Sequence, residues 1–188
     1  MIIVEGSTSR SFTFPADLPL AFAYYTDLNR ILTYLPHIYI ARTYDDNQLR
    51  MCYNTIELGT YKVNIFCDLR AEMAAEERVL RVFPLKGVTP VKTKATFRAT
   101  TAPGRFFSES LFFDEGEQTR IEYRLKLQAE LPSPTGLRFV PTSVINGIAS
   151  SITHRRIKEI ADGFVRRSID AFPEWLGELG DSKMKIIG

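Results

Sequence analysis

The sequence contains few of the residues that form covalent or metal crosslinks. Its 188 residues include two cysteines, Cys52 and Cys67, and two histidines, His37 and His154. Two thiols cannot form a disulfide framework, and these four side chains do not show the spacing of a metal site. We therefore expect no bound metal or cofactor, and we interpret both cysteines as buried apolar residues in a reducing compartment.

Long apolar runs and a charge of one sign are also absent. No apolar run approaches the ~18 residues that span a bilayer, and the opening stretch MIIVEGSTSRSF lacks the basic and apolar regions of a secretory signal. The net charge is +2, and the longest basic clusters are the pairs Arg155-Arg156 and Arg166-Arg167. Nucleic-acid-binding proteins usually show a denser basic stripe. We predict a cytoplasmic protein that binds no nucleic acid and has no transmembrane segment.

Catalytic signatures are missing as well. The sequence has no nucleophile elbow, P-loop, dinucleotide-binding glycine motif or metalloprotease helix motif. Ser150, Ser151 and His154 lie one helical turn apart, but this spacing is common by chance, and His154 falls on the polar side of its predicted helix. His37 follows Pro36 and is typical of a turn. We therefore predict no catalytic residue.

The composition is that of an ordinary globular domain. Apolar residues make up 45% of the chain and charged residues 24%, and a chain of this length buries roughly 70% of its unfolded surface. We predict a single domain over residues 1–180 and a flexible tail over residues 181–188.

Hydrophobic periodicity predicts an α+β protein. A strand over residues 2–14 precedes two short helices, the first capped by Asp17 and the second by Thr26 or Asp27, and Pro36 ends the pair. The period then changes to two, which is typical of half-buried antiparallel strands. We predict these strands over residues 38–44, 49–56, 61–70, 79–83, 95–101, 106–114 and 118–131, with a turn at Pro103-Gly104.

The last strand and the helix after it carry the strongest signals. Apolar and polar side chains alternate throughout residues 120–131 of this strand, so one face of the sheet is wet and the other is covered. A helix over residues 144–171 would be ~42 Å long and would match the ~45 Å of this strand. Its apolar stripe drifts around the axis, which indicates a twisted sheet, a bend near Gly163, or another contact for Phe172 and Trp175.

Arg156 interrupts an apolar row of this helix, which runs through Ile148, Ile152, Arg156, Ile160 and Phe164. In one interpretation, its guanidinium points into a cavity and binds an acidic group of a ligand. In the other, its stem packs on the sheet and its head reaches water or a sheet carboxylate. Glu109 is the partner that we consider. One parity of its strand buries it, whereas the other buries Phe106 and Phe112 and turns it outward. Because an unpaired buried carboxylate is costly, Glu109 and Arg156 are expected to lie both inside or both outside.

Two tyrosines, Tyr61 and Tyr123, lie on faces that we interpret as interior. A buried tyrosine usually finds a hydrogen-bond partner for its hydroxyl. Each is therefore either a core tyrosine bonded to protein or a residue that orients the polar end of a ligand in an apolar pocket.

Two segments resemble the START-like, birch-pollen-allergen-like superfamily, known as SRPBCC. These are FTFPADLPLAFAYYTDLNRILTYLPHI near the start and LPSPTGLRFVPTSVINGIASSITHRRIKEIADGF near the end. The second is similar to a domain-of-unknown-function family of cyanobacteria and chloroplasts. The resemblance covers nearly the whole chain and implies a helix-grip fold, in which a strongly curved antiparallel sheet wraps around the C-terminal helix. It also implies a hydrophobic cavity that binds lipids, pigments, isoprenoids or polyketide-like molecules, but it supplies no catalytic residues.

These observations lead to three hypotheses. The first is a binding protein for an apolar or amphipathic small molecule. The second is a cyclase or aromatase with Glu109 as the acid or base. The third is a scaffold with a filled cavity, which oligomerises through its C-terminal region around Phe172 and Trp175. For the first hypothesis, the predicted cavity residues are Arg156, Tyr61, Ile65, Tyr123, Leu125, Ile152, Ile160, Phe164 and Glu109.

Overall fold

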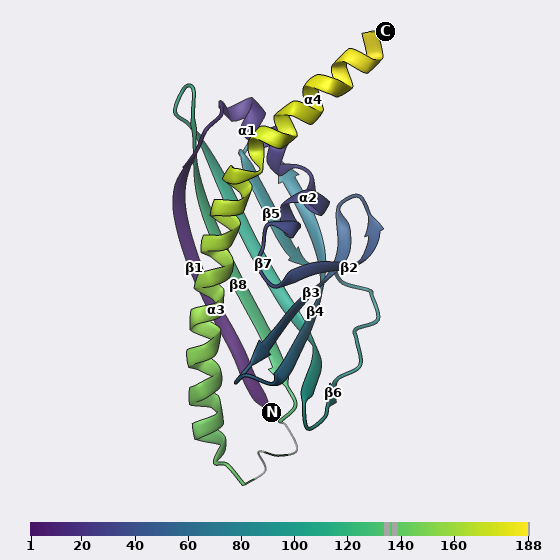
Figure 1. The fold of residues 1–188 in the computed structure, drawn as a ribbon, viewed down its shortest axis with the longest axis vertical. Helices are drawn as coiled ribbons and strands as arrows, with labels where there is room; N and C mark the ends of the chain where they lie inside the picture. The colour runs from purple at the N-terminus through teal and green to yellow at the C-terminus, as the bar shows by residue number, and fades with distance from the viewer. Residues whose placement is uncertain (134–135, 137–138, 188) are drawn as a thin grey trace.

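The structure is a computed structural model that describes residues 1–133, 136 and 139–187, with the backbone alone for residues 181–187. Its elements follow the order that the sequence predicts, which is a strand, two short helices, a run of strands and then the long helix (Figure 1). In chain order they are β1 (Ile2–Phe14), α1 (Leu18–Tyr25), α2 (Leu28–Thr33), β2 (Ile38–Asp45), β3 (Gln48–Glu57), β4 (Tyr61–Ala74), β5 (Val79–Pro84), β6 (Lys94–Ala95), β7 (Ala99–Asp114), β8 (Thr119–Leu131), α3 (Thr142–Asp170) and α4 (Phe172–Ile187).

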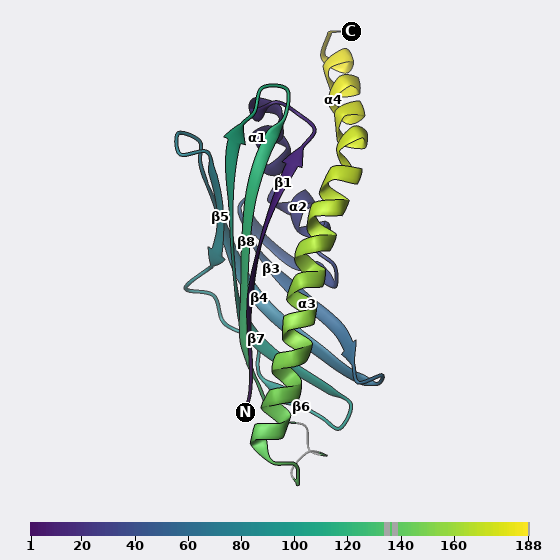
Figure 2. The same ribbon diagram turned by 90° about the vertical axis from the view of Figure 1, so that its left-hand side faces the viewer.

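The strands form one curved sheet in the order β1-β8-β7-β5-β4-β3-β2, with the short β6 paired to β7. Neighbouring strands are antiparallel except for one stretch, where β4 and β7 run parallel over Lys62–Phe66 and Ala99–Pro103. Helix α3 runs along one face of this sheet, and the pair α1 and α2 closes its upper end (Figures 1 and 2). The predicted α+β helix-grip fold is therefore confirmed.

The predicted turn at Pro103-Gly104 is wrong, because β7 continues through it. At this point β7 leaves its parallel pairing with β4 and goes on to pair with β5 at Ser108–Leu111. A Cβ added at Gly104 would overlap the side chain of Ile65 and would lie 3.1 Å from the Cys67 sulfur. The glycine therefore permits a close crossing of two strands, and the Pro-Gly pair marks a bend inside a strand instead of its end.

The two short helices begin at the predicted acidic caps. The Asp17 side chain accepts a hydrogen bond from the backbone N–H of Leu20 at 3.1 Å, and Asp27 accepts one from Arg30 at 3.0 Å. These bonds satisfy helix N–H groups that have no partner within the helix. After α2, the chain turns at His37, whose φ of 63° is a left-handed conformation.

The long helix is divided at Ala171 into α3 and α4, so the drift of its apolar stripe reflects a new contact for its last turns. The Phe172 ring lies 4.7 Å from the Phe14 ring, and the Trp175 ring lies 5.1 Å from the Tyr24 ring. Phe172 and Trp175 are both buried within this chain. They are therefore not available as the partner surface of the scaffold hypothesis.

The remaining part of α4 extends beyond the end of the sheet (Figures 1 and 2). The division into a domain over residues 1–180 and a flexible tail over residues 181–188 stays a prediction, and Gly188 lies outside the described residues. No helix in the described part of the chain is both long and apolar enough to cross a membrane.

Candidate functional site

A cavity of about 480 Å³ lies between α3 and the sheet. Strands β3 and β4 contribute Tyr53, Thr55, Glu57, Tyr61, Val63 and Ile65, and the ends of β1 and β8 contribute Ile2, Val4, Leu127 and Leu131. Helix α3 contributes Ile145, Ile148, Ala149, Ile152, Thr153, Arg156, Ile157 and Ile160. Leu58, Thr60, Phe97, Gly136 and Val140 complete the wall. The lining is therefore mainly aliphatic and aromatic, as expected of a small-molecule pocket.

The cavity exists because α3 lies close to one side of the sheet only. The helix runs along β1 (Figure 1), where a Cβ added at Gly6 would lie 3.1 Å from Thr153 and 3.2 Å from Ile157. The absence of a side chain at Gly6 permits this close approach. Strands β3 and β4 curve back toward the helix from the opposite edge, so that a hollow remains between them.

Five of the predicted cavity residues line this space. They are Arg156, Tyr61, Ile65, Ile152 and Ile160. Their positions follow from two periodicities, because alternate residues of β4 face inward and residues four apart on α3 share one stripe.

Tyr123, Leu125 and Phe164 point inward but do not line the cavity, which corrects the prediction for these three residues. The rings of Tyr123 and Phe164 lie 4.6 Å apart, and all three side chains are buried. They fill the interior between the cavity and the packed aromatic rings of Phe14, Tyr24 and Tyr25. A side chain that points into the interior of this protein therefore does not always line the cavity.

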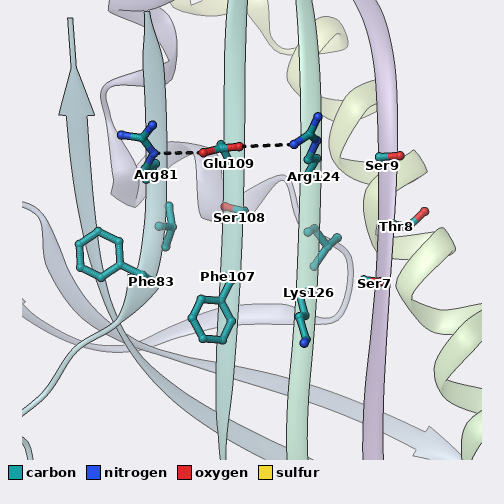
Figure 3. Close-up of a pocket in the computed structure, with 12 residues that line it drawn as sticks. Ser7, Thr8, Ser9, Arg81, Phe83, Phe107, Ser108, Glu109, Arg124 and Lys126 are labelled. Carbon is teal, nitrogen blue, oxygen red and sulfur yellow. Dashed lines mark hydrogen bonds and ion pairs between the residues drawn. The ribbon is translucent and has the colours of Figure 1, made fainter. Parts of the chain in front are cut away.

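Glu109 is on the outer face of the sheet, so its prediction as a cavity residue is wrong. Figure 3 shows it between Arg81 and Arg124, whose nitrogens lie 3.0 and 3.9 Å from its carboxylate. The other parity of β7 is buried, as Phe106 and Phe112 show. Glu109 and Arg156 thus lie on opposite sides of the sheet, contrary to the expectation that they share one side.

Glu57 is the carboxylate that meets Arg156. The Arg156 Nε and Nη2 atoms donate to the two Glu57 oxygens at 2.8 and 3.3 Å, and Nη1 donates to Glu159 at 2.7 Å. The second Glu159 oxygen lies 2.9 Å from Nε2 of His37. This charged cluster links α3 to the end of β3 and to the turn after α2. It fits the interpretation in which the Arg156 head reaches a sheet carboxylate.

The charged cluster shifts the pKa of its members. Hydrogen bonds from Arg156 to Glu57 and Glu159 raise the pKa of the guanidinium. The contact with His37, followed by that with Arg156, lowers the pKa of the Glu159 carboxyl. Glu57 is not among the predicted cavity residues, although it shares the inward parity of Met51, Tyr53 and Thr55 on β3.

Tyr61 lines the cavity and has a hydroxyl without a hydrogen-bond partner among the described residues. Its hydroxyl and that of nearby Thr100 are shielded from solvent, and neither makes a hydrogen bond to the described residues. Burial raises the pKa of Tyr61. Burial also raises the pKa of Tyr53 to about 12. Both phenols are therefore neutral near pH 7 and can exchange hydrogen bonds with an uncharged group.

Other candidates for chemistry lie elsewhere. Cys52 and Cys67 are buried free thiols, as predicted, and burial raises the pKa of both. Ser150, Ser151 and His154 lie on the exposed side of α3. Among the residues that the structure describes, no three side chains of His, Cys, Asp or Glu are grouped as metal ligands.

Comparisons with known proteins give similar folds but no close relative. No family model matches the sequence, and no curated protein matches it. Among solved structures, a conserved protein from Geobacillus kaustophilus has a TM-score of 0.54 at 8% identity, covering 90% of this chain and 95% of that one. The Zhui aromatase/cyclase from Streptomyces sp. R1128 has a TM-score of 0.51 at 12% identity, covering 97% and 96%. TTHA0849 from Thermus thermophilus has a TM-score of 0.50 at 16% identity, covering 88% and 99%.

The fold is START-like. At these identities, the similarity establishes the arrangement of helices and strands and does not assign an activity. The narrower resemblance to a family of cyanobacteria and chloroplasts stays a prediction.

Proposed function

We propose that this protein binds an apolar or amphipathic small molecule in the cavity between α3 and the sheet. The observation that carries the proposal is the cavity itself, with a volume of about 480 Å³ and a mainly apolar wall. Its volume falls within the range of roughly 300–1,000 Å³ that is common for small-molecule sites. A scaffold protein would have needed a filled interior, so the hollow supports binding over that alternative.

The charges around the cavity favour a ligand with an uncharged polar end. Arg156 already donates to two carboxylates, Glu57 and Glu159, which together outweigh its single positive charge. A ligand carboxylate would have to displace Glu57, whose side chain is 9% exposed, and would leave it buried without a cation. The free hydroxyl of Tyr61 suits a neutral carbonyl or hydroxyl group instead. We therefore assign Tyr61 the orienting role and Arg156 the closure of the wall.

The position of Glu109 does not support the cyclase alternative, which required this residue as an acid or base in the cavity. Glu109 lies outside, paired with Arg81, and Glu57, the carboxylate that does face the cavity, is held by Arg156. Neither is placed as a free acid or base, so binding without chemistry is the function that we propose.

Native mass spectrometry of freshly purified protein, with extraction of lipids and pigments, tests this proposal. We expect a molecule to remain bound to the wild-type chain. The variant Ala149→Phe places a ring inside the cavity and should no longer retain the bound molecule. The matched control Ser150→Phe places the same ring on the exposed side of α3 and should still retain the bound molecule. A wild-type protein that carries nothing and binds no apolar probe such as a fluorescent fatty alcohol, or equal retention by both variants, would contradict the proposal.

A further inference from the structure

Exposed apolar side chains gather at the end of the molecule where the cavity reaches the surface. Leu58 and Phe97 line the cavity, yet they are 72% and 73% exposed. They sit on the turn between β3 and β4 and on the turn between β6 and β7, near the start of α3 (Figures 1 and 2). We call this region the open end. Its exposed apolar side chains are Met1, Ile3, Ile56, Leu58, Phe97, Phe139, Val144 and Ile148.

Cations without acidic partners surround these apolar side chains. Lys62 follows Tyr61 in β4, and its backbone N–H donates to the carbonyl of Arg98 at 2.9 Å, which places the two residues together. Lys94 pairs with Thr101 on the neighbouring strand. Lys62, Lys94 and Arg98 are exposed, and none of them forms an ion pair with the described residues. By contrast, Arg81 on the outer face of the sheet is paired with Glu77 and Glu109.

The sequence around the open end is strongly basic. Residues 92–105, which include β6 and the turn between β6 and β7, contain four Lys or Arg residues and no Asp or Glu. Glu57 faces this end, but its charge is neutralised by Arg156. Glu130, on β8 opposite Ile3, contributes an exposed carboxylate to the open end. The positive charges of this segment are therefore largely uncompensated.

We propose that the open end docks onto the surface of an anionic phospholipid bilayer. Apolar side chains on separate turns can enter the region between headgroups and acyl chains, while the cations around them contact lipid phosphates. The apolar wall continues from Leu58 and Phe97 into the cavity, so a hydrophobic molecule could pass between bilayer and cavity without crossing water. This inference extends the proposed function by naming the source of the bound molecule, although the docking itself does not require any cargo.

Vesicle flotation of the full chain tests the docking. We expect binding to vesicles of phosphatidylcholine with about a third phosphatidylserine, and at least about tenfold weaker binding to pure phosphatidylcholine, because several cations contribute. Binding should also weaken as salt is raised, since salt screens exposed charges. Equal binding to both vesicle types, or none to either, overturns the proposal. In the second case, an acidic protein would be the better candidate partner for this surface.

Variants that leave the cavity wall intact locate the docking surface. The triple variant Lys62→Gln, Lys94→Gln and Arg98→Gln should lower the affinity for anionic vesicles roughly a hundredfold, because each cation near such a membrane contributes about fivefold. The matched control removes the same charge elsewhere, at Arg78, Lys86 and Arg167, which are exposed and form no ion pair with the described residues. We expect the control to bind nearly as the wild type does. Equal losses in the two triple variants would show a nonspecific charge effect and reject the surface.

Phe139 supplies an apolar test, because it is 98% exposed and does not line the cavity. Phe139→Ser should weaken binding to anionic vesicles severalfold, whereas Phe107→Ser on the outer face should not. Unchanged binding by Phe139→Ser would show that apolar insertion does not occur there. Because vesicle binding is measured on protein stripped of any bound molecule, its failure is distinguishable from failure of the cavity to retain a ligand.

Discussion

At the scale of single residues, Arg156 explains why a charge interrupts an apolar helical row. Its stem lies in the wall of the cavity, while its head reaches Glu57 at the end of β3. The side chains of Arg156 and Glu57 are 20% and 9% exposed. Such a pair costs desolvation energy and is retained where it fixes an arrangement. Here it holds the helix to the edge of the sheet across the cavity.

Removing Arg156 should destabilise the protein and not merely weaken a ligand. We expect Arg156→Met to lower the free energy of unfolding by about 2 kcal/mol, because Glu57 would stay buried without its cation. Adding Glu57→Gln to this variant should recover part of the loss. Urea unfolding measures both effects. The control Arg155→Met, at an exposed residue without an ion pair to the described chain, should change stability by less than ~0.5 kcal/mol. Equal stability of the two single variants would contradict this role.

Glu159 makes the same cluster sensitive to acid. Its pKa in the folded protein is below the ordinary 4.5, first because of His37 and then because of Arg156. A lowered pKa stabilises the folded state above the unfolded value, and this contribution is lost as the pH falls through the folded pKa. The wild type should therefore exceed Glu159→Gln in stability at neutral pH.

That difference should shrink below about pH 4.5, where Glu159 becomes protonated in the unfolded chain. Urea midpoints measured between neutral and acidic pH test this expectation. Glu117→Gln, in an exposed turn without an ion pair to the described residues, serves as the control and should show little difference at neutral pH. A constant gap between the wild type and Glu159→Gln across the range would rule out the linkage.

Glu57 and Glu109 show how far single residues could be predicted. Following the alternation of β3 through Met51, Tyr53 and Thr55 places Glu57 inward, so a signal for it was present in the sequence. For Glu109, both parities of its strand carry apolar side chains, and no pattern within the strand shows which of them is buried. The pairing of β7 with its neighbours decides it, and that pairing depends on the bend at Gly104.

At the scale of elements, two glycines of α3 have opposite roles. A Cβ added at Gly163 would overlap the ring of Pro36, whereas one added at Gly147 would meet nothing within 4 Å. Gly163 therefore lets α3 pack against the end of α2. Gly147 makes no close contact that requires a glycine, so it only adds the entropic cost of a glycine within a helix.

Substitution by alanine should separate these roles. We expect Gly163→Ala to lower the free energy of unfolding by about 1–3 kcal/mol through overpacking. Gly147→Ala should raise it by up to about 1 kcal/mol through helix propensity. Both variants sit on one helix and add one methyl group, so each controls for the other in a denaturation series. A similar gain in both would show that α3 does not approach Pro36 as closely as the structure indicates.

The elements themselves were largely predictable, and the exceptions have physical causes. The alternation in β8 and the stripe of α3 are long patterns in which a shift by one residue would bury charges. The continuity of β7 was missed, because a Pro-Gly pair usually marks a turn. The division at Ala171 could not be placed either, since it depends on the contacts of Phe172 and Trp175 with α1 and β1.

At the scale of the whole molecule, a cavity depends on separations that no local pattern contains. Periodicity directed Tyr123 and Phe164 inward, but their rings meet each other at 4.6 Å. Ile65 and Ile152 face inward by the same rules and yet border open space. The difference arises because α3 lies on β1, closes against the sheet at the end near α1, and stands away from β4 toward the open end. Sequence patterns therefore predicted the two walls of the site, whereas the distance between them comes from the curvature of the sheet.

An occupied cavity should make the entire fold more stable, because a ligand that binds only the folded state shifts the unfolding equilibrium. At a free ligand concentration of about a hundred times Kd, this contribution is about 2.7 kcal/mol. For a chain of this length it corresponds to a rise in Tm of roughly 5–10 °C. We expect that rise when the organic extract of the purified protein is returned to the stripped wild type, as followed by circular dichroism. Ala149→Phe should show no rise and Ser150→Phe should show the full one, since only the first ring occupies the space that the ligand needs. An equal rise in the two variants would place the ligand outside the cavity, and the hollow behind α3 would then not be the binding site.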